Sequence, residues 1–309
     1  MFEAEAKAKA EASGFSFLTL ASALNSEETN KNNKGVKIMF KISILFGDAP
    51  EMEPSKIAPG FEMCEIPAEL LANAILTNDE WEARKKEIES WNLPPIKVAS
   101  HWLSQPCTTP NADWELLEFW TKRVLRRLAE IGVKTAGIYG LFFRKIEGYS
   151  PVRQLDQAIR YANLLGDTAK QNNMMIALEP MANLTTLWPT YKEGLAFAKR
   201  VDHPNVKVMA DLNYFLKLNQ PFEDIKEDPS FCLHCHIAGE APNGAQPNVG
   251  GLRETHKALF RVLRDVGYEE GVSAACPWRN TGDGEFDLTK ETAKTLKYLQ
   301  QLREEVYSE

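Results

Sequence analysis

Three short apolar runs between residues 174 and 237 decide the fold of this chain: MMIALE (174–179), VKVMAD (206–211) and FCLHCHI (231–237). Each run has the length and the aliphatic content of a buried strand. The first ends in Glu179, the second ends in Asp211, and the third carries His236 just before its last residue. The carboxyl ends of parallel strands share one edge of a sheet, and chemistry is concentrated at that edge. The pattern therefore predicts a divalent-metal site there.

Similar runs recur along the chain from Met39 onward. The eight strand candidates are FKISILF, GFEMCEI, PIKVASH, KTAGIYG, MMIALE, VKVMAD, FCLHCHI and GVSAAC. Because strands and helical segments alternate to the C-terminus, the sheet should be parallel, and eight such units close into a single (β/α)₈ barrel over residues 38–309. An open doubly wound sheet would need a glycine-rich phosphate turn after its first strand, and ILFGDAPEMEP contains no G-x-G-x-x-G.

Apolar spacing and capping residues predict the main helices between these strands. Residues 111–131 form one helix that Gly132 ends, residues 252–265 form another, and the last begins at Leu288. Ser150 followed by Pro151 is the usual order of an N-cap and a first helical residue. For that helix the expected apolar stripe consists of Val152, Leu155 and Ile159.

Composition limits the function classes. The chain has 309 residues, 44% hydrophobic and 26% charged, with a net charge of −7. A negative chain is a poor match for nucleic acid, which needs clustered Lys and Arg, and no apolar run reaches the roughly 18 residues of a membrane span. The five cysteines are scattered and mostly lie in apolar runs, which indicates reduced, buried thiols in a cytoplasmic protein, and we interpret Cys232-x-x-Cys235 in the same way.

Residues 1–37 differ from the rest and are expected to lie outside the barrel. Residues 15–24 are apolar and Ala21-Ser22-Ala23 resembles a signal-peptide cleavage site, but the preceding EAEAKAKAEA mixes acids with lysines instead of forming a positive region. The polar stretch NSEETNKNNKG follows, with the composition of a linker. We expect a flexible or helical extension, or a translation start upstream of the true one near Met39.

Each candidate site residue also has a structural interpretation. Glu179 and Asp211 end apolar strands, and a buried carboxylate is costly unless it is paired, so the alternative to a metal site is a structural ion pair. Side chains alternate along a strand, so His234 and His236 share a face. His236 should reach the barrel mouth. His234 lies deeper, and we interpret it as a core histidine bonded to a backbone carbonyl, or as a residue that orients a ligand from behind.

Several motifs together resemble the sugar isomerase/epimerase group of the xylose-isomerase-like TIM barrels, which includes ketose 3-epimerases, hydroxypyruvate isomerases and inosose dehydratases. The motifs are ALEPMAN, VKVMADLNYF, LHCHIAGE and DVGYEEGVSAACPW, and the resemblance extends from about residue 38 to the end. It implies that Glu179 is a metal ligand and the acid/base catalyst, and that Asp211 and His236 are further ligands. Glu240 of the H-x-H-x-x-G-E motif (residues 234–240) and His101, at the end of the third strand, are then expected to contact substrate.

The sequence departs from that family pattern at three positions. Tyr214 stands where the epimerases have a substrate-contacting histidine, and Cys276-Pro277 stands where they have a Glu-Pro whose glutamate is the fourth ligand and second acid/base group. The expected arginine falls on Pro242, so the nearby Arg253 or Arg279 would have to replace it by a different route. Cys276 is then a thiolate ligand, a proton donor or a neutral core residue.

Three functions remain open at this stage. The first is a metal-dependent isomerase or epimerase that acts on a sugar-like hydroxy-ketone through an enediolate. The second is a metal-dependent lyase or dehydratase acting on a keto-sugar or a C-glycoside, because β-elimination needs only one well-placed base. The third is a degenerate barrel that binds a small ligand without catalysis. The resemblance implies a divalent cofactor (Mn²⁺, Mg²⁺ or Zn²⁺) and a homo-oligomer, either a dimer or a tetramer.

Overall fold

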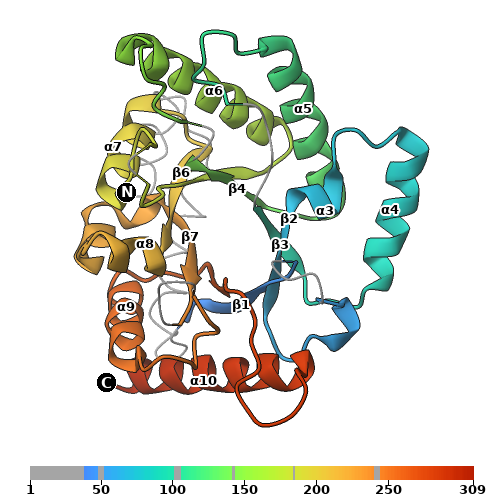
Figure 1. Cartoon of the computed structure of the whole chain (residues 1–309), viewed down its shortest axis with the longest axis vertical. Helices are drawn as coiled ribbons and strands as arrows, with labels where there is room; N and C mark the ends of the chain where they lie inside the picture. The colour runs from blue at the N-terminus through green and yellow to red at the C-terminus, as the bar shows by residue number, and fades with distance from the viewer. Residues whose placement is uncertain (1–37, 48–51, 101–105, 141–142, 184, 240–243) are drawn as a thin grey trace, which may run out of the picture. The chain divides into compact units, whose positions relative to one another are not determined.

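Eight parallel strands close into a barrel in the computed structural model, as the sequence predicted (Figure 1). Each strand pairs with its neighbour in the chain, and β8 pairs with β1 to close the ring. The strands are β1 (Lys41–Leu45), β2 (Met63–Pro67), β3 (Ile96–Ser100), β4 (Thr135–Tyr139), β5 (Met175–Glu179), β6 (Val206–Asp211), β7 (Cys232–Ile237) and β8 (Gly271–Ala274). The structure describes residues 38–47, 52–100, 106–140, 143–183, 185–239 and 244–309, so the predicted extension, residues 1–37, lies outside it.

Helices surround the strands of the compact unit Met39–Glu309 (Figure 1). The α-helices in the described residues are α3 (Ala68–Ala72), α4 (Asn78–Ser90), α5 (Trp114–Glu130), α6 (Pro151–Gln171), α7 (Tyr191–Val201), α8 (Leu212–Lys217), α9 (Arg253–Asp265) and α10 (Leu288–Ser308). Short 3₁₀ helices cover Pro54–Lys56, Phe222–Glu227 and Pro229–Phe231. Within the described residues, no helix is both long enough and apolar enough to cross a membrane.

Local sequence signals account for where the helices begin and what they bury. The Asp113 side chain accepts a hydrogen bond from the backbone N–H of Leu116 at the start of α5, and Ser150 caps α6 in the same way, directly before Pro151. Helix α5 buries Leu117, Leu125 and Leu128 in the hydrophobic core. Full burial of one such side chain contributes about 2 kcal/mol, so the apolar stripe holds α5 in place.

The buried face of α6 differs from the prediction. Val152 is 68% exposed, whereas Ala158, Ala162 and Leu165 are fully buried. Small residues let this helix approach the strands closely, and a reading based on large branched side chains overlooks them. The Gln154 side chain occupies the buried position in the first turn, where it bonds to the backbone of Ile146 and of Tyr149. The stripe Val152, Leu155 and Ile159 was therefore wrong at its first residue.

All five cysteines are free and buried, as predicted. Burial raises the pKa of the Cys232 thiol to about 12, with hydrogen bonds that partly offset this effect, and burial also raises the pKa of Cys235. Neither thiol has the lowered pKa of a redox-active cysteine. The C-x-x-C pair is therefore part of the packing around β7.

His256 ties the outer helices to the end of β7. Its ring Nε2 lies 2.9 Å from the carbonyl oxygen of Ala238, and its Nδ1 lies 2.8 Å from the hydroxyl of Tyr298 on α10. A carbonyl oxygen only accepts, so Nε2 carries the proton and Nδ1 accepts from the tyrosine. Burial lowers the pKa of His256 to about 4, although the bond to Ala238 opposes that shift.

This histidine makes stability depend on pH. Its folded pKa lies below the ordinary value of about 6.5, so the unfolded chain binds the proton more readily, and stability present above pH 6.5 is lost as the pH falls toward 4. The free energy of unfolding should fall by about 3 kcal/mol through this group alone. We expect urea unfolding at pH 7, 6, 5 and 4 to show a steeper decline for the wild type than for His256→Gln. Parallel curves for the two proteins would contradict this prediction.

Candidate metal centre

Three predicted side chains meet at the carboxyl end of the barrel. Glu179 is the last residue of β5, Asp211 is the last residue of β6, and His236 is the penultimate residue of β7. All three are at least nine-tenths buried. Their oxygen and nitrogen atoms lie within 4.8 Å of one another, close enough to share one ion. The structure therefore brings together the three residues on which the sequence prediction depended.

The imidazole of His236 lies at the centre of this arrangement. Its Nδ1 is 3.3 Å from Oδ2 of Asp211 and 3.7 Å from Oε1 of Glu179. Two ligands that each lie about 2.1 Å from one ion are roughly 3 to 3.5 Å apart. The spacing of these three atoms is thus close to that of a shared ion.

Backbone structure fixes the orientation of Asp211 and His236. Asp211 is also the N-cap of α8, and its Oδ1 accepts a hydrogen bond of 2.7 Å from the backbone N–H of Asn213. Only Oδ2 then remains directed at the histidine. Strands β6 and β7 pair in a register that sets Asp211 directly opposite His236. Two residues after β7, a Cβ at Gly239 would lie 2.4 Å from the carbonyl oxygen of Val249, so only glycine fits there.

The carboxylates around His236 favour a positive charge on or beside its ring. Burial by itself would lower the pKa of His236, but the carboxylates of Glu65, Asp211 and Glu179 raise it well above its ordinary value. Two carboxylate oxygens next to the ring Nδ1 repel a bare lone pair, and either a proton or a metal cation at this position removes the repulsion. The donor set of two carboxylates and one imidazole suits Mn²⁺, Mg²⁺ or Zn²⁺. The residues present therefore fit a divalent ion.

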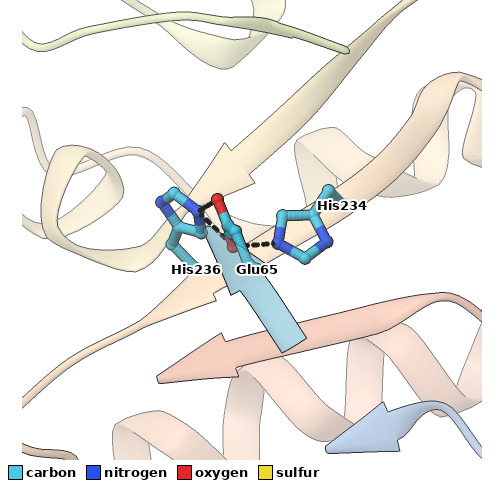
Figure 2. Close-up of side chains that lie close together, drawn as sticks. All are labelled: Glu65, His234 and His236. Atoms are coloured by element: carbon cyan, nitrogen blue, oxygen red, sulfur yellow. Dashed lines mark hydrogen bonds and ion pairs between the residues drawn. The ribbon is translucent and has the colours of Figure 1, made fainter. Parts of the chain in front are cut away.

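Glu65 is a member of the site that the sequence interpretation missed. It lies on β2, is fully buried, and its two carboxylate oxygens are 3.0 and 3.1 Å from Nε2 of His236 (Figure 2). Burial would raise the pKa of Glu65, but His236 and His234 together hold it well below its usual range. The available signal was a lone carboxylate inside the apolar strand MCEIP, the same kind of signal that identified Glu179.

His234 lies one layer deeper than His236, as expected from strand alternation, but its partners differ from the predicted carbonyl. Its Nε2 is 2.7 Å from Oε2 of Glu65 (Figure 2). The same nitrogen is 3.0 Å from Oγ of Ser273. The interpretation as a core histidine bonded to the backbone is therefore wrong. His234 contacts Glu65, which in turn contacts His236, so it is linked through Glu65 to the candidate ion site.

Cys276 is buried in the segment after β8. Among the described residues, two groups are close enough to hold an ion, Glu179–Asp211–His236 and Glu65–His234–His236, and neither includes Cys276. The structure thus gives no support to the reading of Cys276 as a thiolate ligand. Its place directly after a strand end still puts it on the same side of the barrel as the three clustered ligands.

The four expected substrate contacts do not gather in one place as the three candidate ligands do. Tyr214 lies on α8, three residues after Asp211, and is half-buried. Arg253 begins α9 and pairs with Glu305 of α10, over the ring of Tyr298. Its guanidinium is thus held in the outer helical layer, so the structure does not bring Arg253 into the clustered group. His101 and Glu240 lie outside the described residues.

Comparisons with known proteins agree with this architecture. A sequence model described as the xylose isomerase-like TIM barrel matches residues 58–302, and no curated protein matches the chain. D-psicose 3-epimerase from Clostridium cellulolyticum H10, solved with D-tagatose, superposes with a TM-score of 0.69 at 20% identity over 85% of this chain and 99% of its own. 3-Keto-D-glucoside 4-epimerase from E. coli gives 0.64 at 21% identity, over 86% and 99%. At these identities, the superpositions establish a shared fold.

Proposed function

Because the chain belongs to the xylose isomerase-like TIM barrel family, we propose that it is a metal-dependent isomerase or epimerase acting on a sugar-like hydroxy-ketone. The observation that carries the proposal is the convergence of Glu179 and Asp211 on Nδ1 of His236 at the carboxyl end of the barrel. The names of the structural neighbours, D-psicose 3-epimerase and 3-keto-D-glucoside 4-epimerase, support a sugar substrate. We retain the expectation of a homo-oligomer.

We assign a separate role to each residue of the site. Asp211, His236 and Glu179 would hold a divalent ion, which, when bound, would supply positive charge that favours loss of the proton from the carbon next to the carbonyl. Glu179 removes that proton as general base, because the other carboxylate, Asp211, already caps α8 through its Oδ1. Tyr214, on α8 beside Asp211, is the candidate for contact with a substrate hydroxyl.

A lyase is the second candidate, and one observation favours it. The second acid/base glutamate of the epimerases is replaced by Cys276, which is buried and outside both clusters of possible ligands. An epimerase needs a proton carrier on each face of its intermediate, whereas a β-elimination needs one base and a leaving group. The same Glu179 would then start an elimination from a keto-sugar.

Hydrogen exchange at the substrate carbon tests the proposal directly. Protein loaded with Mn²⁺ in D₂O is expected to wash deuterium into the position next to the carbonyl of at least one ketose among D-fructose, D-tagatose and D-psicose, as read by mass spectrometry. Glu179→Gln should slow this exchange by at least about 100-fold. The exposed Glu223→Gln serves as the matched control and should behave like the wild type.

The outcomes separate the candidates. Exchange or a rearranged ketose supports the isomerase, and an unsaturated product with loss of a leaving group supports the lyase. Metal-loaded protein that shows neither reaction with any member of the panel, and none with a 3-keto-glucoside, would count against both activities and leave a ligand-binding barrel.

A further inference from the structure

We propose that Glu65 is a positioning residue, whose carboxylate accepts a hydrogen bond from Nε2 of His236 and thereby directs Nδ1 of that ring at the metal. The inference rests on the proposed metal site of Glu179, Asp211 and His236. It adds a residue from β2 and specifies which ring nitrogen binds the ion.

Hydrogen-bonding capacity determines which nitrogen this is. An ionised carboxylate can only accept hydrogen bonds, so the nitrogen that faces Glu65 must carry the proton. Both oxygens of Glu65 face Nε2 of His236, at 3.0 and 3.1 Å. A neutral imidazole has one N–H and one lone pair, which leaves the lone pair on Nδ1. That nitrogen is the one that lies 3.3 Å from Asp211.

A competing reading is that Glu65, His234 and His236 form a second ion site, because their ligand atoms also lie close together. The distance from Oε2 of Glu65 to Nε2 of His234 is 2.7 Å, which is a hydrogen-bond length and shorter than the roughly 3 to 3.5 Å between two ligands of one ion. In addition, a neutral His236 has one lone pair, and this lone pair, on Nδ1, faces Asp211 and Glu179. The geometry therefore favours a hydrogen-bonded support.

Hydrogen bonds from deeper in the barrel hold the Glu65 carboxylate in place. His234 bonds its Oε2, Ser273 lies 3.0 Å from the same nitrogen of His234, and the Ser273 hydroxyl bonds that of Ser43 at 2.9 Å. The four strands involved, β1, β2, β7 and β8, are neighbours across the point where the barrel closes. The rings of His234 and His236 stand perpendicular, with centroids 5.3 Å apart, on either side of the carboxylate (Figure 2). These contacts all come from residues on strands, which hold the carboxylate in one orientation.

Substitution by glutamine isolates the role of the second carboxylate oxygen. A glutamine at this position would keep the shape of the side chain but offer one acceptor and one NH₂ group to two histidines that each donate from Nε2. One of the rings must then turn or change tautomer. Loss of a partner that orients a metal-bound histidine typically lowers metal affinity by about 10- to 100-fold. We expect that range for Zn²⁺ binding to Glu65→Gln, measured by competition with a chelator.

A matched control is available on the same segment of the chain. Glu62 also lies near β2 and bonds Arg303 and the backbone N–H of Ile42, outside both clusters. Glu62→Gln should bind Zn²⁺ like the wild type. If neither the wild type nor Glu62→Gln binds Zn²⁺, the proposed metal site fails. If both bind and Glu65→Gln binds equally well, the metal site stands and the role of Glu65 is refuted.

Nitrogen-15 NMR of the zinc-loaded wild type gives a readout that needs no Glu65 variant to fold. His236 is assigned by the signals lost in His236→Asn. We expect Nε2 of His236 to carry a proton and Nδ1 to show the shift of a metal-bound nitrogen. A metal-bound Nε2 with a protonated Nδ1 would overturn the proposal, as would a second zinc ion per chain that disappears in Glu65→Gln.

Discussion

Replacing Asp211 with asparagine is expected to abolish metal binding, from roughly one divalent ion per chain to a small fraction of that. Oδ2 of Asp211 faces Nδ1 of His236 at 3.3 Å, and an amide at this position removes the negative charge that attracts the ion. The amide oxygen can still accept the capping hydrogen bond from the backbone N–H of Asn213, so α8 should remain in place. Elemental analysis after dialysis against Mn²⁺, followed by removal of free metal, measures the effect.

The control for this experiment is a carboxylate of the outer layer. Asp167 on α6 is exposed and pairs with His203. Asp167→Asn changes the net charge by the same amount and should retain full metal content. Thermal unfolding adds a second measure, because an ion that binds only the folded state raises the melting temperature of the wild type and should not raise that of Asp211→Asn. Equal metal content in the two variants would refute the assignment of Asp211.

The fold could be predicted because its signals are local. Each strand is a short apolar run. Helices such as α5 and α6 begin at capping residues, Asp113 and Ser150, and Gly132 follows the end of α5, so neighbouring residues contain the information. The barrel then follows from repetition of one unit. The error at Val152 shows the limit of such signals. The size of its side chain suggested a buried position, but Val152 is exposed and the small residues Ala158 and Ala162 are buried instead.

The site was predictable to the extent that position along a strand determines function. Glu179, Asp211 and His236 lie at or beside the carboxyl ends of their strands. Those ends share one face of the barrel, which brings the three side chains together. Glu65 was not predictable in this way, since it is 171 residues from His236 in the chain and becomes its neighbour only when the barrel closes. Its burial in mid-strand suggested a role, but its partner depends on the register of four strands.

The proposed chemistry depends on whether a second proton carrier exists. Glu179 can remove a proton from one face of a hydroxy-ketone, and inversion requires that a proton return from the opposite face. By its resemblance to the ketose epimerases, Cys276 stands at the position of their second glutamate, and among the described residues neither group that could hold an ion includes it. We therefore expect the wild type to exchange the hydrogen next to the carbonyl with retention of configuration, and to invert that carbon slowly or not at all.

Cys276→Glu is expected to convert exchange with retention into epimerisation. The longer side chain supplies a carboxyl group at the end of β8, and a well-placed general acid or base accelerates proton transfer by about 100- to 10,000-fold. A gain in this range should appear as inverted ketose when products of D-fructose, D-tagatose and D-psicose are separated by chromatography. A carboxylate buried there is stable only if it contacts positive charge, so the gain should require bound metal.

Two further variants make the interpretation of this gain unambiguous. Cys276→Gln has the same length as the glutamate variant but no ionisable group, and it should show no gain. Cys276→Ala should retain both metal and the exchange reaction of the wild type. Rapid inversion by the wild type would show that another group already returns the proton. Loss of wild-type activity in Cys276→Ala, with metal still bound, would mean that the thiol itself carries the proton. In that case burial at the end of β8 would have placed a catalytic thiol where related enzymes use a carboxylate.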